Sequence, residues 1–135
     1  MEMIESERVP VNESMSPIDL NMSNMTVVTL NPLNWINYNI TPKKLKITNT
    51  GKNVVVCGNW EKSTPHLSSG PLRGDYMFSQ IHFHWGPTEM MGSEHFIDGG
   101  SQPMELHAVH FKSDYKSQEI AMRETDAPVD SKFIT

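Results

Sequence analysis

The apolar residues of this chain follow no sustained helical period, and where they show order they alternate with polar residues in twos. Because successive side chains of a β-strand point to opposite faces, this alternation is typical of half-buried strands. We predict six short strands from it, at Val27–Leu30, Lys44–Ile47, Asn53–Cys57, Met77–Trp85, Glu94–Ile97 and Met104–Phe111.

Turn-forming residues separate the predicted strands. They form the groups Asn31-Pro32, Thr41-Pro42, Asn49-Thr50-Gly51, Ser68-Ser69-Gly70-Pro71 and Asp98-Gly99-Gly100. A helical turn is predicted near Ser117–Glu124, and Val129 with Phe133-Ile134 indicates the approach to a further strand. The sequence therefore predicts a mostly β fold with a largely antiparallel sheet.

Length and charge limit the classes of function. The 135 residues supply one domain at most, and 11 Lys and Arg against 16 Asp and Glu give a net charge of −5. Binding to nucleic acid requires clustered positive charge, which this sequence lacks. No stretch approaches the roughly 20 consecutive apolar residues of a membrane helix. We expect neither a nucleic-acid partner nor a transmembrane segment.

The sequence leaves the compartment open. Its polar, acidic N-terminus lacks the basic start and apolar core of a signal peptide, and the lone Cys57 cannot form an internal disulfide. Four sequons, beginning at Asn12, Asn21, Asn24 and Asn39, would be glycosylation acceptors in a secreted chain. The alternatives are a cytoplasmic chain and a secreted chain whose signal peptide lies outside this sequence.

Four of the six histidines lie between residues 82 and 107. By strand alternation His82 and His84 share one face of their predicted strand, about 6.5–7 Å apart along the backbone. His107 lies on the last predicted strand and would join them if the two strands are neighbours. Three histidines can bind zinc and leave the fourth tetrahedral position to water, which is the arrangement of a catalytic zinc site.

Polar residues accompany two of these histidines on the same face. Gln80 precedes His82 by two positions and Glu105 precedes His107 by two, so each can accept a hydrogen bond from the ring nitrogen that does not bind metal. The alternative is that all three are ordinary half-buried histidines of a sheet. Spacing alone leaves both interpretations open.

Several segments resemble the α-carbonic anhydrase family in order, spacing and residue identity. The central block consists of FSQIHFHWG at 78–86, GSEH at 92–95, DGG at 98–100 and PMELHAVHF at 103–111. Three upstream segments are similar to further parts of the family, namely SPIDL at 16–20, NTG at 49–51 and GPL at 70–72. The match runs from about residue 14 to residue 122.

This resemblance implies the family's α+β fold, whose central twisted sheet carries the zinc site and is incomplete in this chain. Residues 1–13 would be an N-terminal tail and residues 14–135 part of the domain. The three positions that match the family's Zn²⁺ ligands are His82, His84 and His107, and Gln80 and Glu105 match the partners that orient them.

Further roles follow from the resemblance. Glu94 matches the buried acid that orients a gatekeeper threonine, His95 a structural histidine, and Val109 one wall of the carbon dioxide pocket. Lys52 stands at the position of the proton shuttle. Because a lysine of ordinary pKa ~10.4 is protonated at neutral pH, we expect slow proton transfer unless His66 or buffer substitutes. The alternative is that Lys52 is a solvated loop charge.

The activity that the resemblance implies is zinc-dependent, reversible hydration of carbon dioxide to bicarbonate and a proton. Aromatic sulfonamides or anions would inhibit it by binding at the zinc. Members of the family are longer, so we expect this chain to be a fragment or a truncated product. Glu94 would then lack its threonine and become protonated or exposed to water. The alternative function is a catalytically impaired or inactive zinc-binding or interaction module.

Overall fold

The computed structural model describes residues 16–125 and 133–134. Its elements, in chain order, are β1 (Asp19–Leu20), β2 (Leu33–Ile36), β3 (Lys44–Asn49), β4 (Val54–Asn59), β5 (His66–Ser69), β6 (Tyr76–Trp85), β7 (Phe96–Ile97), β8 (Gly100–Ser101), β9 (Met104–Lys112), α1 (Gln118–Arg123) and β10 (Phe133–Ile134). The chain is therefore mostly β, as the sequence predicts.

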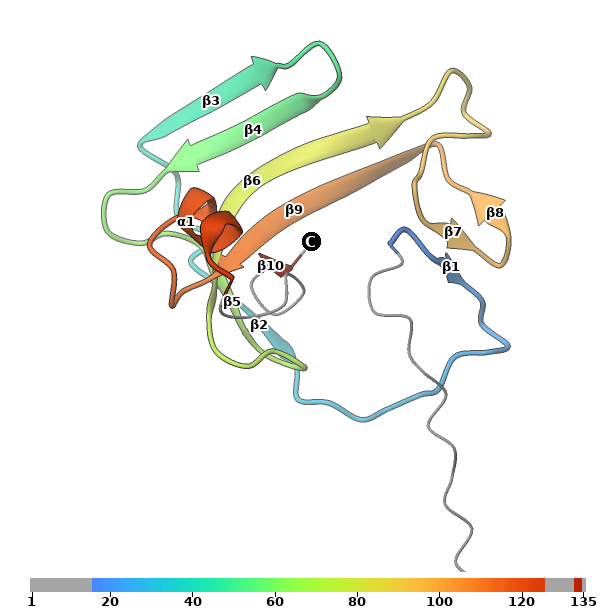
Figure 1. Ribbon diagram of the computed structural model, residues 1–135, viewed down its shortest axis with the longest axis horizontal. Helices are drawn as coiled ribbons and strands as arrows, with labels where there is room; N and C mark the ends of the chain where they lie inside the picture. Colours follow the sequence, from blue (N-terminus) through green and yellow to red (C-terminus); the bar gives the residue numbers. More distant parts are fainter. Residues whose placement is uncertain (1–15, 126–132, 135) are drawn as a thin grey trace, which may run out of the picture.

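The main sheet has seven strands. Its path runs β10-β9-β6-β4-β3, with β5 joined to β6 and β2 joined to β5. All of these pairings are antiparallel. Figure 1 shows β6 and β9 as two long, curved neighbours, with the β3–β4 hairpin along the upper border. The prediction of a largely antiparallel central sheet is confirmed.

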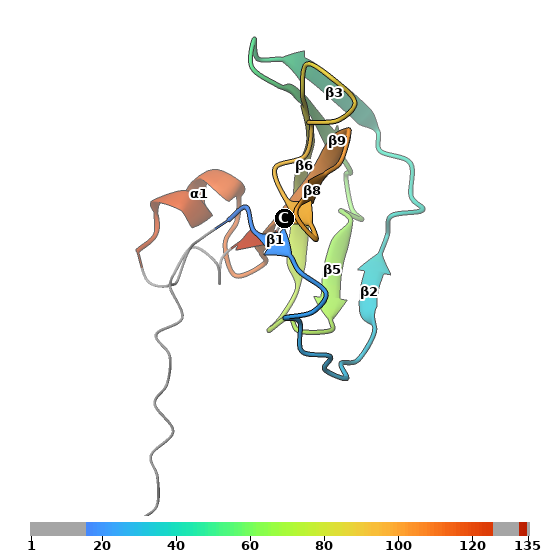
Figure 2. The same ribbon diagram turned by 90° about the vertical axis from the view of Figure 1, so that its right-hand side faces the viewer.

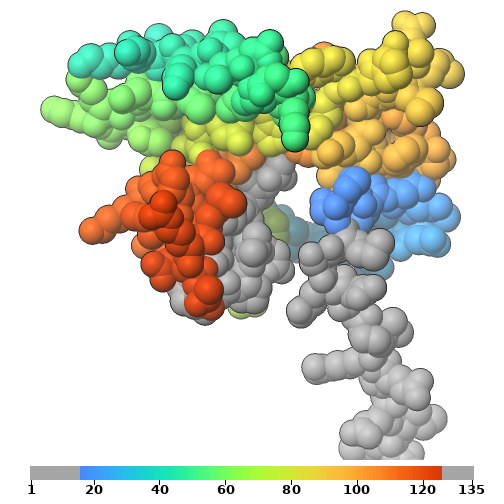
Figure 3. All heavy atoms as spheres, turned by 45° about the horizontal axis from the view of Figure 1, so that its top comes forward, coloured from blue at the N-terminus to red at the C-terminus, as the bar shows by residue number. Residues whose placement is uncertain are grey.

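A smaller sheet is built on the connection between β6 and β9, residues 86–103. Strand β7 pairs in parallel with β1 and antiparallel with β8. Side chains strengthen this junction, because the Gly99 N–H donates to Asp19 Oδ1 at 3.1 Å and the Met22 N–H donates to Asp98 Oδ1 at 2.8 Å. Figure 3 shows the blue N-terminal segment lying against the yellow-to-orange connection. The N-terminal strand thus fastens this connection.

Helix α1 follows β9 and lies on one side of the sheet (Figure 2). Ser117 caps its N-terminus by accepting a hydrogen bond from the Ile120 N–H at 3.3 Å. Its Gln118 accepts a hydrogen bond from Ser79 Oγ, at the bulge that interrupts the β6–β9 register between Phe78 and Gln80. The bulge therefore turns one β6 side chain toward the helix.

Among the described residues, no helix is both long and apolar enough to cross a bilayer.

The buried core lies where β5, β6 and β9 meet. Its apolar members are Leu67, Tyr76, Val109 and Ala121, and the largest fully buried side chains are His110 and Pro65. Strand pairing places Tyr76 opposite both Leu67 and Lys112. This core anchors the beginning of β6 and the end of β9, so the opposite ends of these strands extend away from it.

Some sequence predictions need correction. The prediction of a strand at Val27–Leu30 is wrong, because this segment has no strand pairing in the described structure and Val27 is 96% exposed. The predicted Glu94–Ile97 strand contracts to β7. The sequence patterns also did not predict β1, β2 and β5, because these strands are short and pair with segments that are distant in the sequence.

Other predictions agree with the elements or cannot be compared with them. The helical turn and the strand at Phe133-Ile134 are present as α1 and β10. The proposed boundary between residues 13 and 14 and the residue Val129 lie outside the described residues.

Candidate metal centre

Three histidines from β6 and β9 converge on one face of the main sheet. The strand register places His82 directly opposite His107, and His84 opposite Glu105. The ring centroids are 5.1 Å apart for His82 and His84, 5.0 Å for His82 and His107, and 4.5 Å for His84 and His107. One ring nitrogen from each lies within 4.8 Å of the others. The predicted triad is therefore brought together.

Hydrogen bonds fix the protonated nitrogen of two of these rings. His82 Nδ1 donates to Gln80 Oε1 at 2.9 Å, and His107 Nε2 donates to Glu105 Oε1 at 2.6 Å. A neutral imidazole carries one proton, so the lone pairs lie on His82 Nε2 and His107 Nδ1. These are the nitrogens that can bind a metal.

The third ring contains a buried nitrogen that needs a partner. His84 Nε2 is inaccessible to solvent and has no hydrogen-bond partner in the described part of the chain. A buried polar atom without a partner is costly in free energy, and such atoms call for a specific explanation. A metal ion bound by the three histidines would satisfy it, so the residues present fit a tetrahedral, nitrogen-rich zinc site.

Glu105 is the hydrogen-bond acceptor that links two histidines of the cluster. Besides His107, it accepts hydrogen bonds from His95 Nδ1 at 2.5 Å and from the His95 backbone N–H at 2.8 Å. Burial raises the pKa of Glu105, but the three donors outweigh it and lower the pKa to about 2. The carboxylate therefore stays ionised and holds both imidazoles in place.

Burial also acts on the ligand candidates. It lowers the pKa of His82, and the neighbouring imidazoles His107 and His84 lower it further. The nearby Glu94 opposes this shift without reversing it. A lowered pKa keeps the His82 ring neutral, which is the form that binds a metal.

Glu94 lies beside the triad in the 86–103 connection. Its Oε1 is 3.3 Å from His84 Nδ1, and its Oε2 is 3.9 Å from His107 Nε2. The side chain is 42% exposed, so it is not the buried acid that the resemblance implies.

The remaining predicted site residues lie at different distances from the triad along the sheet. Val109 is 8% exposed and pairs with Gln80 on β6, so its strand position puts it on the histidine face. Lys52 is exposed in the turn between β3 and β4. His66 pairs with Met77 at the far end of β6, so it is separated from His84 by most of that strand.

Sequence reasoning missed the sharing of Glu105 between two histidines. A second set of potential ligand atoms, from His95, Glu105 and His107, also lies within 4.8 Å. Hydrogen bonds from His95 and His107 to Glu105 account for this set, so it is a network and not a separate metal site. The signal was present in the sequence as the His95 of GSEH, but its partner could not be assigned without the fold.

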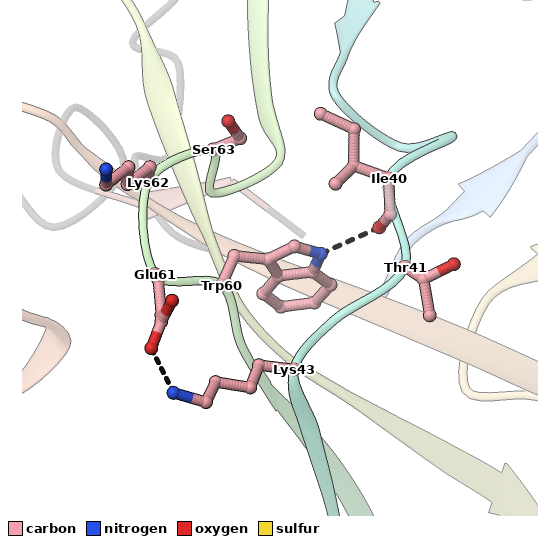
Figure 4. A pocket seen from close by; sticks show the side chains of 7 residues that line it. All are labelled: Ile40, Thr41, Lys43, Trp60, Glu61, Lys62 and Ser63. Atoms are coloured by element: carbon pink, nitrogen blue, oxygen red, sulfur yellow. Dashed lines mark hydrogen bonds and ion pairs between the residues drawn. The ribbon is translucent and has the colours of Figure 1, made fainter.

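Two hollows lie apart from the histidines. One has a volume of about 210 Å³. Figure 4 shows the residues that line it, among which the Trp60 indole N–H donates to the Ile40 carbonyl at 2.8 Å and Lys43 pairs with Glu61. The other, about 230 Å³, is mainly apolar and is also bordered by Trp60. No triad histidine lines either hollow, so neither is part of the candidate metal centre.

Comparison with known proteins gives a family match over most of the chain. The family described as eukaryotic-type carbonic anhydrase matches residues 6–129, a span that includes every residue of the candidate metal centre.

Individual relatives agree with the family match. The chain is 49% identical over 69 residues to carbonic anhydrase 7 of Mus musculus, covering 51% of this chain and 26% of the relative. It is 41% identical over 100 residues to carbonic anhydrase 1 of Oryctolagus cuniculus, covering 73% and 41%. It is 36% identical over 117 residues to carbonic anhydrase 3 of Bos taurus, covering 84% and 44%. The chain thus spans less than half the length of these curated relatives.

Proposed function

Because this chain belongs to the eukaryotic-type carbonic anhydrase family, we propose that it binds zinc through His82, His84 and His107 and takes part in reversible hydration of carbon dioxide to bicarbonate. The observation that carries the proposal is the arrangement of ring nitrogens. Each ring has one nitrogen facing a polar partner, and one nitrogen from each ring lies within 4.8 Å of the others. Neutral imidazoles are good ligands for zinc.

Zinc bound by these histidines supplies Lewis acidity that makes water a nucleophile near neutral pH. The residues of the chain have separate tasks. Gln80 and Glu105 hold the protonated nitrogens of His82 and His107 away from the metal position, which fixes the orientation of both rings. Val109 contributes an apolar surface on the same face, suited to carbon dioxide. Because a lysine, Lys52, stands at the shuttle position, we expect slow proton release to solvent or buffer.

The exposed carboxylate of Glu94 favours a second candidate function. An acid that is open to water does not offer the buried contact expected of a carbonic anhydrase active site. The second candidate is a zinc-binding or interaction module with impaired catalysis.

The ligand set is tested by substitution. In His107→Ala we expect loss of stoichiometric zinc, because the remaining two histidines provide one nitrogen ligand fewer than a catalytic zinc site uses. The measurement is zinc content per chain after removal of loosely bound metal. His66→Ala is the matched control, since His66 lies outside the cluster, and it should retain zinc. Unchanged zinc content in His107→Ala would rule out this ligand set.

Catalysis is tested separately on the zinc-loaded chain. The rate of carbon dioxide hydration is measured from the protons that the reaction releases, with and without an aromatic sulfonamide. Hydration that the sulfonamide abolishes supports the enzyme. Stoichiometric zinc without sulfonamide-sensitive hydration would support the impaired module instead.

A further inference from the structure

We propose that Glu94 is a positioning residue for His84, whose ring it holds with Nδ1 protonated and Nε2 directed toward the metal. This proposal rests on the proposed function, because it concerns the same histidine cluster. It gives Glu94 a role distinct from orienting a threonine, which the family resemblance implies.

The first step concerns what β6 and β9 can offer to each ring. His82 and His107 each bond to a polar residue two positions earlier on the same strand. For His84 that position is occupied by His82, which already donates to Gln80. The directly opposite residue is Glu105, which already accepts from His95 and His107. An orienting partner for His84 must therefore come from another segment.

The second step is that the 86–103 connection supplies a carboxylate at the required atom. Glu94 Oε1 lies 3.3 Å from His84 Nδ1, on the opposite edge of the ring from the buried Nε2. Among the described residues, the groups with metal-binding spacing do not include Glu94. Its position is therefore that of a partner to a ligand and not of a fourth ligand.

The third step is that the backbone on both sides of Glu94 is fixed. The N–H groups of Gly92 and Ser93 both donate to the Gln102 carbonyl, at 3.0 and 2.8 Å. On the other side the His95 N–H donates to Glu105 at 2.8 Å. A side chain at Gly92 would overlap the carbonyl of Pro103, so the close approach requires glycine. Glu94 thus projects from a segment anchored to the start of β9.

The expected consequence is loss of zinc affinity when the carboxylate is removed. Without it the His84 ring can rotate and can place its proton on either nitrogen, so fewer molecules present an unprotonated Nε2. Removing a partner of this kind typically weakens metal binding by about 10- to 100-fold. We expect a loss in that range for Glu94→Ala.

The experiment uses the full 135-residue chain. Zinc affinity is measured by competition with a chelator for the wild type, Glu94→Ala, Glu94→Gln and Glu94→Asp. The glutamine oxygen can still accept from Nδ1, so this variant should recover most of the affinity. The aspartate variant should not recover the affinity, because its side chain is shorter. This variant also provides the test if Glu94→Ala does not fold. Glu89→Gln, an exposed acid of the same connection, should match the wild type.

A second readout needs no metal. Nitrogen NMR of the zinc-free chain reports which His84 nitrogen is protonated. We expect Nδ1 in the wild type and in Glu94→Gln, and a mixture in Glu94→Ala and Glu94→Asp. A merely structural role of Glu94 would not change this ratio.

The two proposals fail in distinguishable ways. A wild-type chain that binds no zinc, or that keeps it in His107→Ala, contradicts the proposed function. A wild-type chain that binds zinc, with alanine and aspartate variants of unchanged affinity and unchanged His84 protonation, overturns the role of Glu94 alone.

Discussion

At the scale of single residues, His110 shows how burial sets a protonation state away from the metal centre. It is 1% exposed, and its Nδ1 donates to the Ala108 carbonyl at 2.7 Å. Its Nε2 therefore accepts from the Tyr38 hydroxyl. Burial lowers the pKa of His110, the Ala108 bond opposes this, and burial raises the pKa of Tyr38 to about 12. Both side chains are thus held neutral.

This pair predicts a pH dependence of stability. Below the ordinary histidine pKa of ~6.5 the unfolded chain binds a proton that the folded His110 does not, so the free energy of unfolding should fall as pH drops below that value. In His110→Gln the fall between pH 7 and pH 5 should be smaller. Urea unfolding of both zinc-free proteins measures the difference, and parallel pH profiles would contradict it.

At the scale of elements, the packing of Trp60 against β4 requires a glycine at position 58. The Trp60 ring folds back over Gly58, where an added Cβ would overlap the ring atoms Cη2 and Cζ3. The hydrogen bond from the Trp60 indole to Ile40 restrains the ring in this position (Figure 4), and Trp60 lines both hollows. Gly58 therefore allows the connection after β4 to pack against that strand.

Gly58→Ala should lower the free energy of unfolding by about 1–3 kcal/mol, because an overpacked site must shift its neighbours. In a Trp60→Ala background the same change should cost much less, since the overlapping ring is gone. Denaturant unfolding of the four proteins completes this double-mutant cycle. Equal costs in the two backgrounds would show that the ring is not the cause.

Elements whose signal is local could be predicted from the sequence. Alternation identified β6 and β9, and the Asn49-Thr50-Gly51 turn between β3 and β4 uses Gly51 at a φ of 83°. The β-branched run at Val27 has the propensity of a strand but no partner within the described structure. β2 and β5 are strands because they pair with each other, which local patterns do not reveal.

The candidate site likewise contains parts that the sequence predicts and parts that only the fold reveals. The triad and its two strand-borne partners, Gln80 and Glu105, follow from alternation together with the family resemblance. The contact between Glu94 and His84 depends on the course of the 86–103 connection. That course depends on hydrogen bonds to Gln102 and Glu105 and on the pairing of β7 with the distant β1, neither of which residue alternation predicts.

At the scale of the whole molecule, the sheet face opposite the histidines is apolar and open. The strand register places Ile47, Val56, Ile81 and Ala108 in one row across it. Ile47 is 70% exposed, and Leu106, on the same face of β9, is 53% exposed. Contiguous exposed apolar surface favours association.

We therefore expect concentration-dependent self-association of the chain through this face. Ile47→Lys and Leu106→Lys should reduce it without changing zinc content, because neither residue lies on the histidine face. Thr48→Lys, on the other face of β3, is the matched control. Sedimentation across a range of protein concentrations measures the effect, and a wild-type monomer throughout that range would contradict it.

The pairing of β1 with β7 has a consequence for the order of assembly. The β6–β9 pairing that gathers the three histidines closes over one connection, whereas β1 must reach β7 from much earlier in the chain. The entropic cost of closing a loop grows with its length, so contacts local in sequence form more readily than distant ones. The zinc ligands are thus expected to meet early in folding, together with the Gln102 and Glu105 contacts that anchor Glu94, whereas the contacts of the 86–103 connection with the N-terminal strand form later.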